Sequence, residues 1–83
     1  MEEVFSKLHW VRTAENKRTL FLNTIPVGCV IHCETNLLTG KSFEHELTTR
    51  FENYDAAREA VERCTRYHIV YVMLRYGKWP SDN

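Results

Sequence analysis

The spacing of apolar residues changes near residue 53, and this change constrains the fold more than any other feature. Before it, apolar and polar residues alternate in short runs, as in strands with one buried face. After it, apolar residues such as Ala57, Val61 and Cys64 recur every three or four positions, as in a helix packed on one side. A chain of 83 residues has room for one domain. The sequence therefore predicts a single small α+β domain, in which an antiparallel meander of about four strands precedes a C-terminal helix packed on one face.

The strands are predicted from runs rich in β-branched and aromatic residues. These runs are 7–13, 19–24, 28–35 and 42–51. The alternation is strictest in the last run, where Phe43, Leu47 and Phe51 share one face. Breaks between the runs fall at 14–18, 24–28 and 36–41. The third break contains Gly40, which can supply a positive φ, so residues 28–35 and 42–51 are expected to form a hairpin.

The helix is predicted over residues 54–76. Asn53 or Asp55 can cap its first turn, and Gly77, with Pro80 beyond it, gives an ordinary helix end. A second possibility remains, because residues 67–76 also have the composition of a strand. In that alternative the helix ends near Tyr67 and a fifth strand forms at 69–75.

The predicted core follows from these faces. It comprises Leu8 or Trp10, Leu20, Leu22, Cys29, Ile31, Cys33, Phe43, Leu47, Phe51, Ala57, Val61 and Cys64. On one strand, Cys29 and Cys33 would lie roughly 13 Å apart, too far for a disulfide. We expect all three cysteines to be reduced and buried. With no secretory signal at Met1 and no apolar run long enough to span a membrane, the chain is expected to be cytoplasmic, without a membrane partner.

The balance of basic and acidic residues argues against nucleic acid as the partner. Lys plus Arg is 11 and Asp plus Glu is 11, whereas a dedicated nucleic-acid binder usually carries a basic excess. The charge is nevertheless uneven, since residues 34–62 are net acidic and residues 63–78 are net basic. This distribution predicts a dipolar molecule that could steer a charged partner.

Groups that could support catalysis or bind a metal are poorly arranged. On one strand, Cys29 and Cys33 would face away from His32, so they could not share a zinc ion. Cys64 and His68 are one helical turn apart, but on the predicted buried stripe. Glu44 and Glu46 would lie roughly 7 Å apart on an exposed strand face without a cleft. We therefore predict no enzymatic activity, no metal and no cofactor.

Aromatic residues near the C-terminus suggest protein binding. Tyr67, Tyr71 and Arg75 form a stripe at intervals of four residues, and Tyr and Arg are favoured in interface hot spots. The candidate protein-binding residues are Tyr67, Tyr71, Arg75, Tyr76, Trp79, Glu44 and Glu46. Alternatively, these rings could be ordinary core, and a second copy of the chain could complete a thin core. The predicted function is that of an inhibitor or adaptor, of the type of small phage-encoded proteins that modulate host proteins or counter host defence.

The alternative function is nucleic-acid binding. The stretch from Phe51 to Ala60, together with the predicted hairpin before it, resembles the hairpin-to-helix junction of the AP2-like arm-binding domains of phage integrases. The resemblance covers residues 28–64 and implies a sheet that lies in the major groove. This chain departs from it by carrying glutamates, among them Glu34 and Glu52, on the predicted open face. The candidate nucleic-acid-binding residues are Lys7, Arg12, Lys17, Arg18, Arg66, Arg75 and Lys78.

Overall fold

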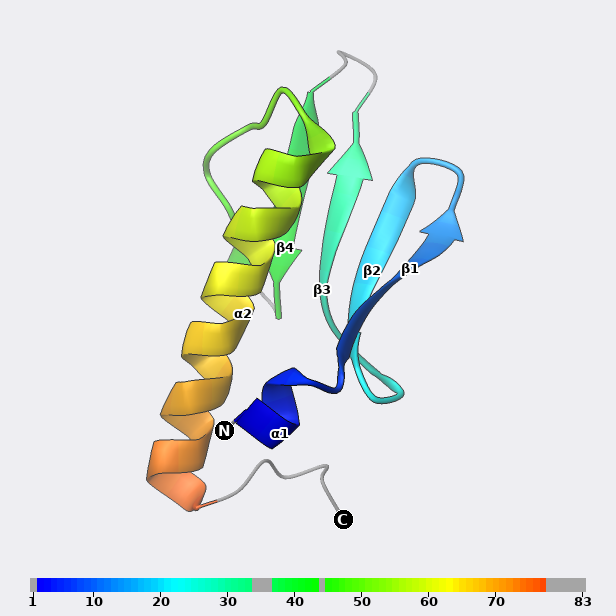
Figure 1. Cartoon of the computed structure of the whole chain (residues 1–83). Helices are drawn as coiled ribbons and strands as arrows, with labels where there is room; N and C mark the ends of the chain where they lie inside the picture. Colours follow the sequence, from blue (N-terminus) through cyan, green and yellow to red (C-terminus); the bar gives the residue numbers. More distant parts are fainter. Residues whose placement is uncertain (1, 34–36, 44, 78–83) are drawn as a thin grey trace.

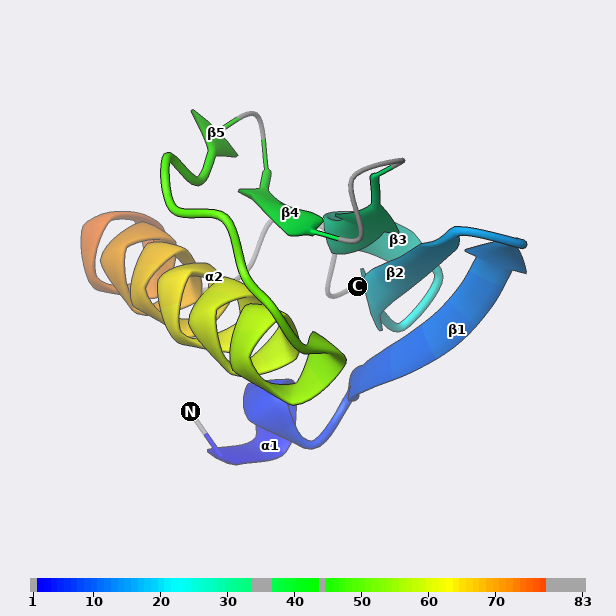
Figure 2. The same cartoon turned by 90° about the horizontal axis from the view of Figure 1, so that it is seen from above.

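The computed structural model describes residues 2–33, 37–43 and 45–77, and it confirms the predicted fold class. The elements are α1 (Glu2–Phe5), β1 (Leu8–Ala14), β2 (Lys17–Leu22), β3 (Ile25–His32), β4 (Leu38–Ser42), β5 (His45–Glu46) and α2 (Tyr54–Tyr76) (Figure 1). The strands form one antiparallel sheet in the order β1-β2-β3-β4-β5. Helix α2 packs on one face of this sheet, as the view from above shows (Figure 2).

Helix α2 begins and ends where the sequence predicts. The side chain of Asn53 accepts a hydrogen bond of 2.8 Å from the backbone N–H of Ala56, which satisfies one free donor of the first turn. At the other end Gly77 adopts a left-handed conformation with φ of 80°, and its N–H donates to the carbonyl of Met73. The helix is continuous between these caps, so the alternative of a fifth strand at 69–75 is wrong.

The predicted strand at 42–51 is wrong in its position. Strand β4 instead covers Leu38–Ser42, most of which falls in the predicted 36–41 break, and the chain turns at Phe43. The positive φ that the turn requires is found at Phe43 (54°) and not at Gly40, which lies inside β4. After the turn, residues 45–51 run back along β4, where the N–H of Leu47 donates to the carbonyl of Gly40. Apolar and polar residues alternate without interruption before and after this turn. The sequence pattern therefore does not reveal where the turn lies.

Strand β3 begins inside the predicted 24–28 break and contains a bulge. Leu20 pairs with Gly28 and Phe21 pairs with Pro26, which leaves Val27 as an extra residue in the ladder. The bulge explains how a strand with Pro26 near its start can pair with β2. On the helix side of β3, Val27 is 1% exposed and belongs to the core cluster.

The predicted buried face of β3 is therefore reversed. Gly28 faces α2, so Val30 faces α2 as well, whereas Cys29 and Ile31 point to the other side of the sheet. Cys29 is still buried, but Ile31 and Cys33 are only half-buried, and so is Cys64 on α2.

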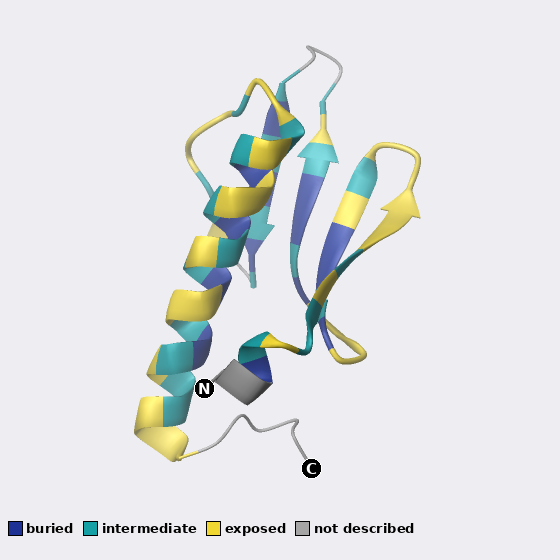
Figure 3. Ribbon diagram, viewed as in Figure 1, coloured by how far each residue is buried: buried dark blue, intermediate teal, exposed yellow. Residues whose placement is uncertain are grey.

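The core lies between α2 and the helix side of the sheet. Its buried residues are Val4, Leu20, Leu22, Val27, Val30, Leu38, Ala57, Val61 and Ile69 (Figure 3). Four of these, Leu20, Leu22, Ala57 and Val61, were predicted. Of the other predicted core residues, Leu8, Trp10, Phe43, Leu47 and Phe51 are half-buried and pack against this cluster.

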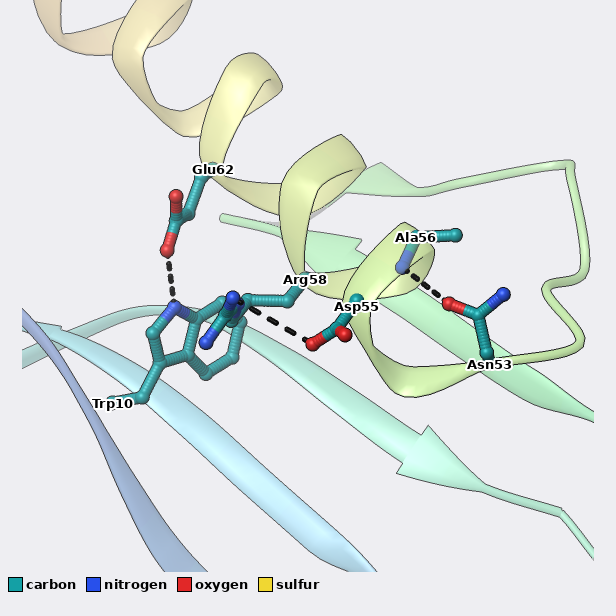
Figure 4. A network of polar contacts seen from close by, with 6 residues as sticks. All are labelled: Trp10, Asn53, Asp55, Ala56, Arg58 and Glu62. Carbon is teal, nitrogen blue, oxygen red and sulfur yellow. Dashed lines mark hydrogen bonds and ion pairs between the residues drawn. The ribbon is translucent and has the colours of Figure 1, made fainter.

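Three contacts fix how α2 lies on the sheet. A Cβ atom added at Gly28 or Gly40 would lie only 2.8 or 2.7 Å from a methyl group of Val61, so two glycines make room for this side chain. The fully buried hydroxyls of Ser42 and Thr65 form a hydrogen bond of 2.9 Å. The indole N–H of Trp10 donates to the carboxylate of Glu62, which joins β1 to α2 (Figure 4).

We predict that Gly40→Ala lowers the free energy of unfolding by about 1–3 kcal/mol, because the added methyl group overpacks the contact with Val61. Val61→Ala should also destabilise, because it leaves a cavity. The double variant should lose less than the two single losses together, since each change relieves the other. Urea denaturation of the four proteins measures this coupling.

The matched control for this cycle is Val11→Ala combined with Val61→Ala. Val11 is 41% exposed on the opposite side of the sheet, so the two losses should add. Additive losses for Gly40→Ala and Val61→Ala would contradict the proposed contact.

Candidate protein-binding surface

The two sides of α2 differ sharply. The buried residues Ala57, Val61, Thr65 and Ile69 recur every four positions and face the sheet. The side away from the sheet is largely exposed, and the last turns of the helix extend beyond β4 (Figures 1 and 3). The exposed side therefore has no second layer of structure from the described part of the chain.

Large apolar side chains lie on this exposed side. Tyr67 is 74% exposed, Tyr71 is 54% exposed and Leu74 is 76% exposed. Together with the half-buried Val70 they occupy positions i, i+3, i+4 and i+7, so they adjoin one another on one side of the helix. We call these four residues the outer patch. The alternative in which the tyrosine rings belong to the core is wrong.

Contacts of a charged side chain restrain the aromatic rings at the C-terminal end of this surface. The guanidinium of Arg75 donates a hydrogen bond of 3.1 Å to the hydroxyl of Tyr71 and lies 5.8 Å from the centre of the Tyr76 ring. Tyr76 is itself 65% exposed. The structure thus brings together four predicted binding residues, Tyr67, Tyr71, Arg75 and Tyr76, on one end of α2.

The remaining predicted binding residues are not part of this surface. Glu46 lies in β5, opposite Lys41 of β4. Glu44 and Trp79 lie outside the described residues. Glu46 is exposed, as predicted, but it lies in the two-residue strand β5 and not in one long strand, because β4 ends at Ser42.

A shallow apolar hollow of about 260 Å³ lies beside the outer patch. It is lined by Arg63, Cys64, Tyr67 and His68. The His68 ring stacks on His45 at 5.8 Å and meets the edge of Phe43 at 5.3 Å, so it connects α2 to the turn before β5. Within the described residues, no hydrogen bond joins the Cys64 thiol to His68, and the buried Nδ1 of His68 has no partner. This pair thus lacks the orientation that an activated nucleophile requires.

A larger cleft was not predicted. It has a volume of about 440 Å³ and lies where the chain after β5 returns along β4. Its lining is mixed, with the apolar Ile31 and Leu47 beside the charged Lys41, Glu46 and Arg50. No sequence signal could have located it, because it depends on the turn at Phe43.

The candidate nucleic-acid-binding residues are dispersed. Arg12 and Arg18 are paired across β1 and β2, and Arg18 stacks on the ring of Tyr54 at the start of α2. Arg75 lies 21 residues along the helix from Tyr54, about 30 Å away. Arg66 lies over the ring of Phe5 near the N-terminus.

The other basic candidates do not join these arginines into one surface. Lys17 points to the opposite side of the sheet from Arg18, since strand neighbours alternate. Lys7 lies in the turn between α1 and β1. Lys78 is outside the described residues.

Three further properties concern only the part of the chain that the structure describes. It contains no group of three or more His, Cys, Asp or Glu residues that could hold a metal ion. None of its helices is both long and apolar enough to cross a membrane. The three cysteines are free.

We predict that Tyr67→Ala and Tyr71→Ala each change the free energy of unfolding by less than about 0.5 kcal/mol, because both rings are exposed. The matched control is Ile69→Ala on the opposite side of the same helix. Ile69 is 0% exposed, and its truncation should cost about 2–5 kcal/mol. If thermal or urea denaturation gave similar losses for Tyr71→Ala and Ile69→Ala, Tyr71 would be a core residue.

Comparison with known proteins gives no relative from which a function could be transferred. No family model, no curated protein and no solved structure matches this chain. The resemblance of residues 28–64 to integrase arm-binding domains gains no support from these comparisons.

Proposed function

We propose that this protein is a small non-catalytic protein-binding module that binds its partner through the outer patch of α2. The observation that carries the proposal is the exposure of Tyr67, Tyr71 and Leu74 on adjacent turns. Contiguous apolar surface of this kind is uncommon on a monomer and typically marks an interaction site. Tyrosine is also enriched among residues that dominate binding energy, because it buries a large area with few rotatable bonds.

The packing that holds α2 in place beneath the outer patch favours a role in protein binding. α2 is held against the sheet by Val61 and by the Ser42–Thr65 hydrogen bond, and both of its ends are capped. A partner would therefore meet a preformed helix, and binding would lose little free energy to ordering of the backbone. The contact from Arg75 to Tyr71 also restricts one of the rings in advance.

The mode of action is proposed as that of an inhibitor or adaptor, as in small phage-encoded accessory proteins. The absence of an arranged catalytic group among its described residues supports this choice. The Cys64 thiol has no hydrogen bond to His68, and Glu46 lies opposite Lys41. Free cysteines favour a reducing compartment such as the cytoplasm.

We predict that the tagged chain captures a partner protein from lysate of its source in a manner that depends on the outer patch. Leu74→Glu should reduce capture at least about tenfold, because it places a charge at an apolar contact. The matched control is Val11→Ala, which truncates an exposed apolar residue of β1 and should leave capture unchanged. Quantitative mass spectrometry, with and without nuclease, is the measurement.

Two results would contradict the proposal. Equal capture by the wild-type chain and Leu74→Glu would place the binding surface elsewhere. Capture that disappears with nuclease would instead indicate nucleic-acid binding and direct attention to the arginines at Arg12, Arg18 and Arg66.

A further inference from the structure

The solvent side of α2 carries a second regular spacing, opposite the buried residues. Positions follow one another there at alternating intervals of four and three residues. They are Ala56, Ala60, Arg63, Tyr67, Val70 and Leu74, which we call the outer seam. All six are exposed or half-buried, and five of them are apolar. Each pair of successive intervals sums to seven residues, the repeat with which two helices pack side by side over several turns.

The sizes of the seam residues are ordered along the helix. Its first half has the small Ala56 and Ala60 followed by the long Arg63, and its second half has the large Tyr67, Val70 and Leu74. Two parallel copies would oppose small to small and large to large, which leaves gaps at one end and overpacks the other. Two antiparallel copies would oppose Leu74 to Ala56 and Val70 to Ala60, and the two long side chains Tyr67 and Arg63 would meet at the centre.

We propose that the outer seam is an interface between two copies of this chain, with their α2 helices antiparallel. The inference rests on the proposed function, because it names the partner of the same surface. One register pairs all six positions. Leu74 packs on Ala56 of the second copy, Val70 on Ala60 and Tyr67 on Arg63, and the two-fold axis passes near the level of Thr65. The seam is about 27 Å long, because it spans 18 residues of helix.

The middle of the seam is suited to this pairing. The hollow lined by Arg63, Cys64, Tyr67 and His68 lies there, and its walls are mainly apolar. It offers a place for the Tyr67 ring of the second copy, beside the guanidinium of Arg63. Glu59 holds that guanidinium through a contact of 3.0 Å, so its charge is partly compensated before the copies meet. Two-fold symmetry makes the same contact twice.

The charge distribution also favours the antiparallel arrangement. Residues 54–63 of α2 contain three acidic and two basic side chains, whereas residues 64–76 contain two arginines and no acid. Antiparallel packing sets the net acidic half of one helix against the net basic half of the other. Parallel packing would set like charges together.

The first test is the mass of the full chain in solution. Sedimentation equilibrium should give twice the chain mass of 9.9 kDa at high protein concentration. Leu74→Glu should weaken the dimer at least about tenfold, whereas Val11→Ala should not change it. Circular dichroism should confirm that both variants fold, since both positions are exposed.

The second test addresses the register. Ala56→Glu alone and Leu74→Lys alone should each weaken the dimer, because each places a charge against an apolar residue. Mixed in equal amounts, the two variants should form a mixed dimer that regains most of the lost affinity. In it the new carboxylate at position 56 meets the new ammonium at position 74, and an unaltered Leu74 meets an unaltered Ala56 at the other end. The pair cannot form within one chain, because the two positions are about 27 Å apart.

The outcomes separate this inference from the proposed function. A chain that remains monomeric at every concentration overturns the homodimer, and capture of a different protein through Leu74 would still support the proposed function. A dimer that Leu74→Glu leaves intact overturns the seam. A dimer whose mixed variants show no recovery overturns the antiparallel register. A seam-dependent dimer that captures no other protein supports the homodimer and contradicts the inhibitor or adaptor role.

Discussion

The structure depends on the close approach of α2 to the sheet at Val61. The side chain of Val61 lies against Gly28 of β3 and Gly40 of β4, where any larger residue would hold the helix away. Because the approach is so close, the hydroxyls of Ser42 and Thr65 can meet between the layers, and neither is left buried without a partner. Close packing at this point lets a domain with one helix and one sheet exclude water from a thin core.

This arrangement also explains the exposed surface. A two-layer domain covers only one side of its helix, and the four-residue spacing from Ala57 to Ile69 uses that side fully. The outer side then needs no apolar residues for folding, and a typical surface helix carries polar residues there. Tyr67, Tyr71 and Leu74 depart from this expectation. We propose protein binding as the reason for their presence, because their largely exposed side chains are not needed for the core.

The sequence was sufficient for the fold class and for the helix, because the change of period and the caps at Asn53 and Gly77 are local signals. It was insufficient for the strand faces. The bulge at Val27 and the turn at Phe43 both follow from tertiary packing. Each of them shifts the alternation of the strand, so that a different set of side chains faces α2.

The stripe of tyrosines was predicted from spacing alone. Spacing could not decide its exposure, however, since core and surface residues repeat at the same interval. The contribution of Leu74 was missed, although the four–three spacing that reveals it is visible in the sequence.

A self-complementary surface and a surface for another protein impose different requirements on one helix. An amphipathic partner needs only an apolar stripe, whereas pairing with an identical helix also needs each large residue to find a small one in the reversed sequence. Ala56 opposite Leu74 and Ala60 opposite Val70 meet that second requirement at the two ends of the seam, which an apolar stripe alone would not produce, while Tyr67 and Arg63 meet at its centre. If another protein uses the same residues, it has to compete with the second copy. Its apparent affinity would then fall as the concentration of this chain rises above the dissociation constant of the dimer. Self-association would in that case set how much of the outer patch is free to bind.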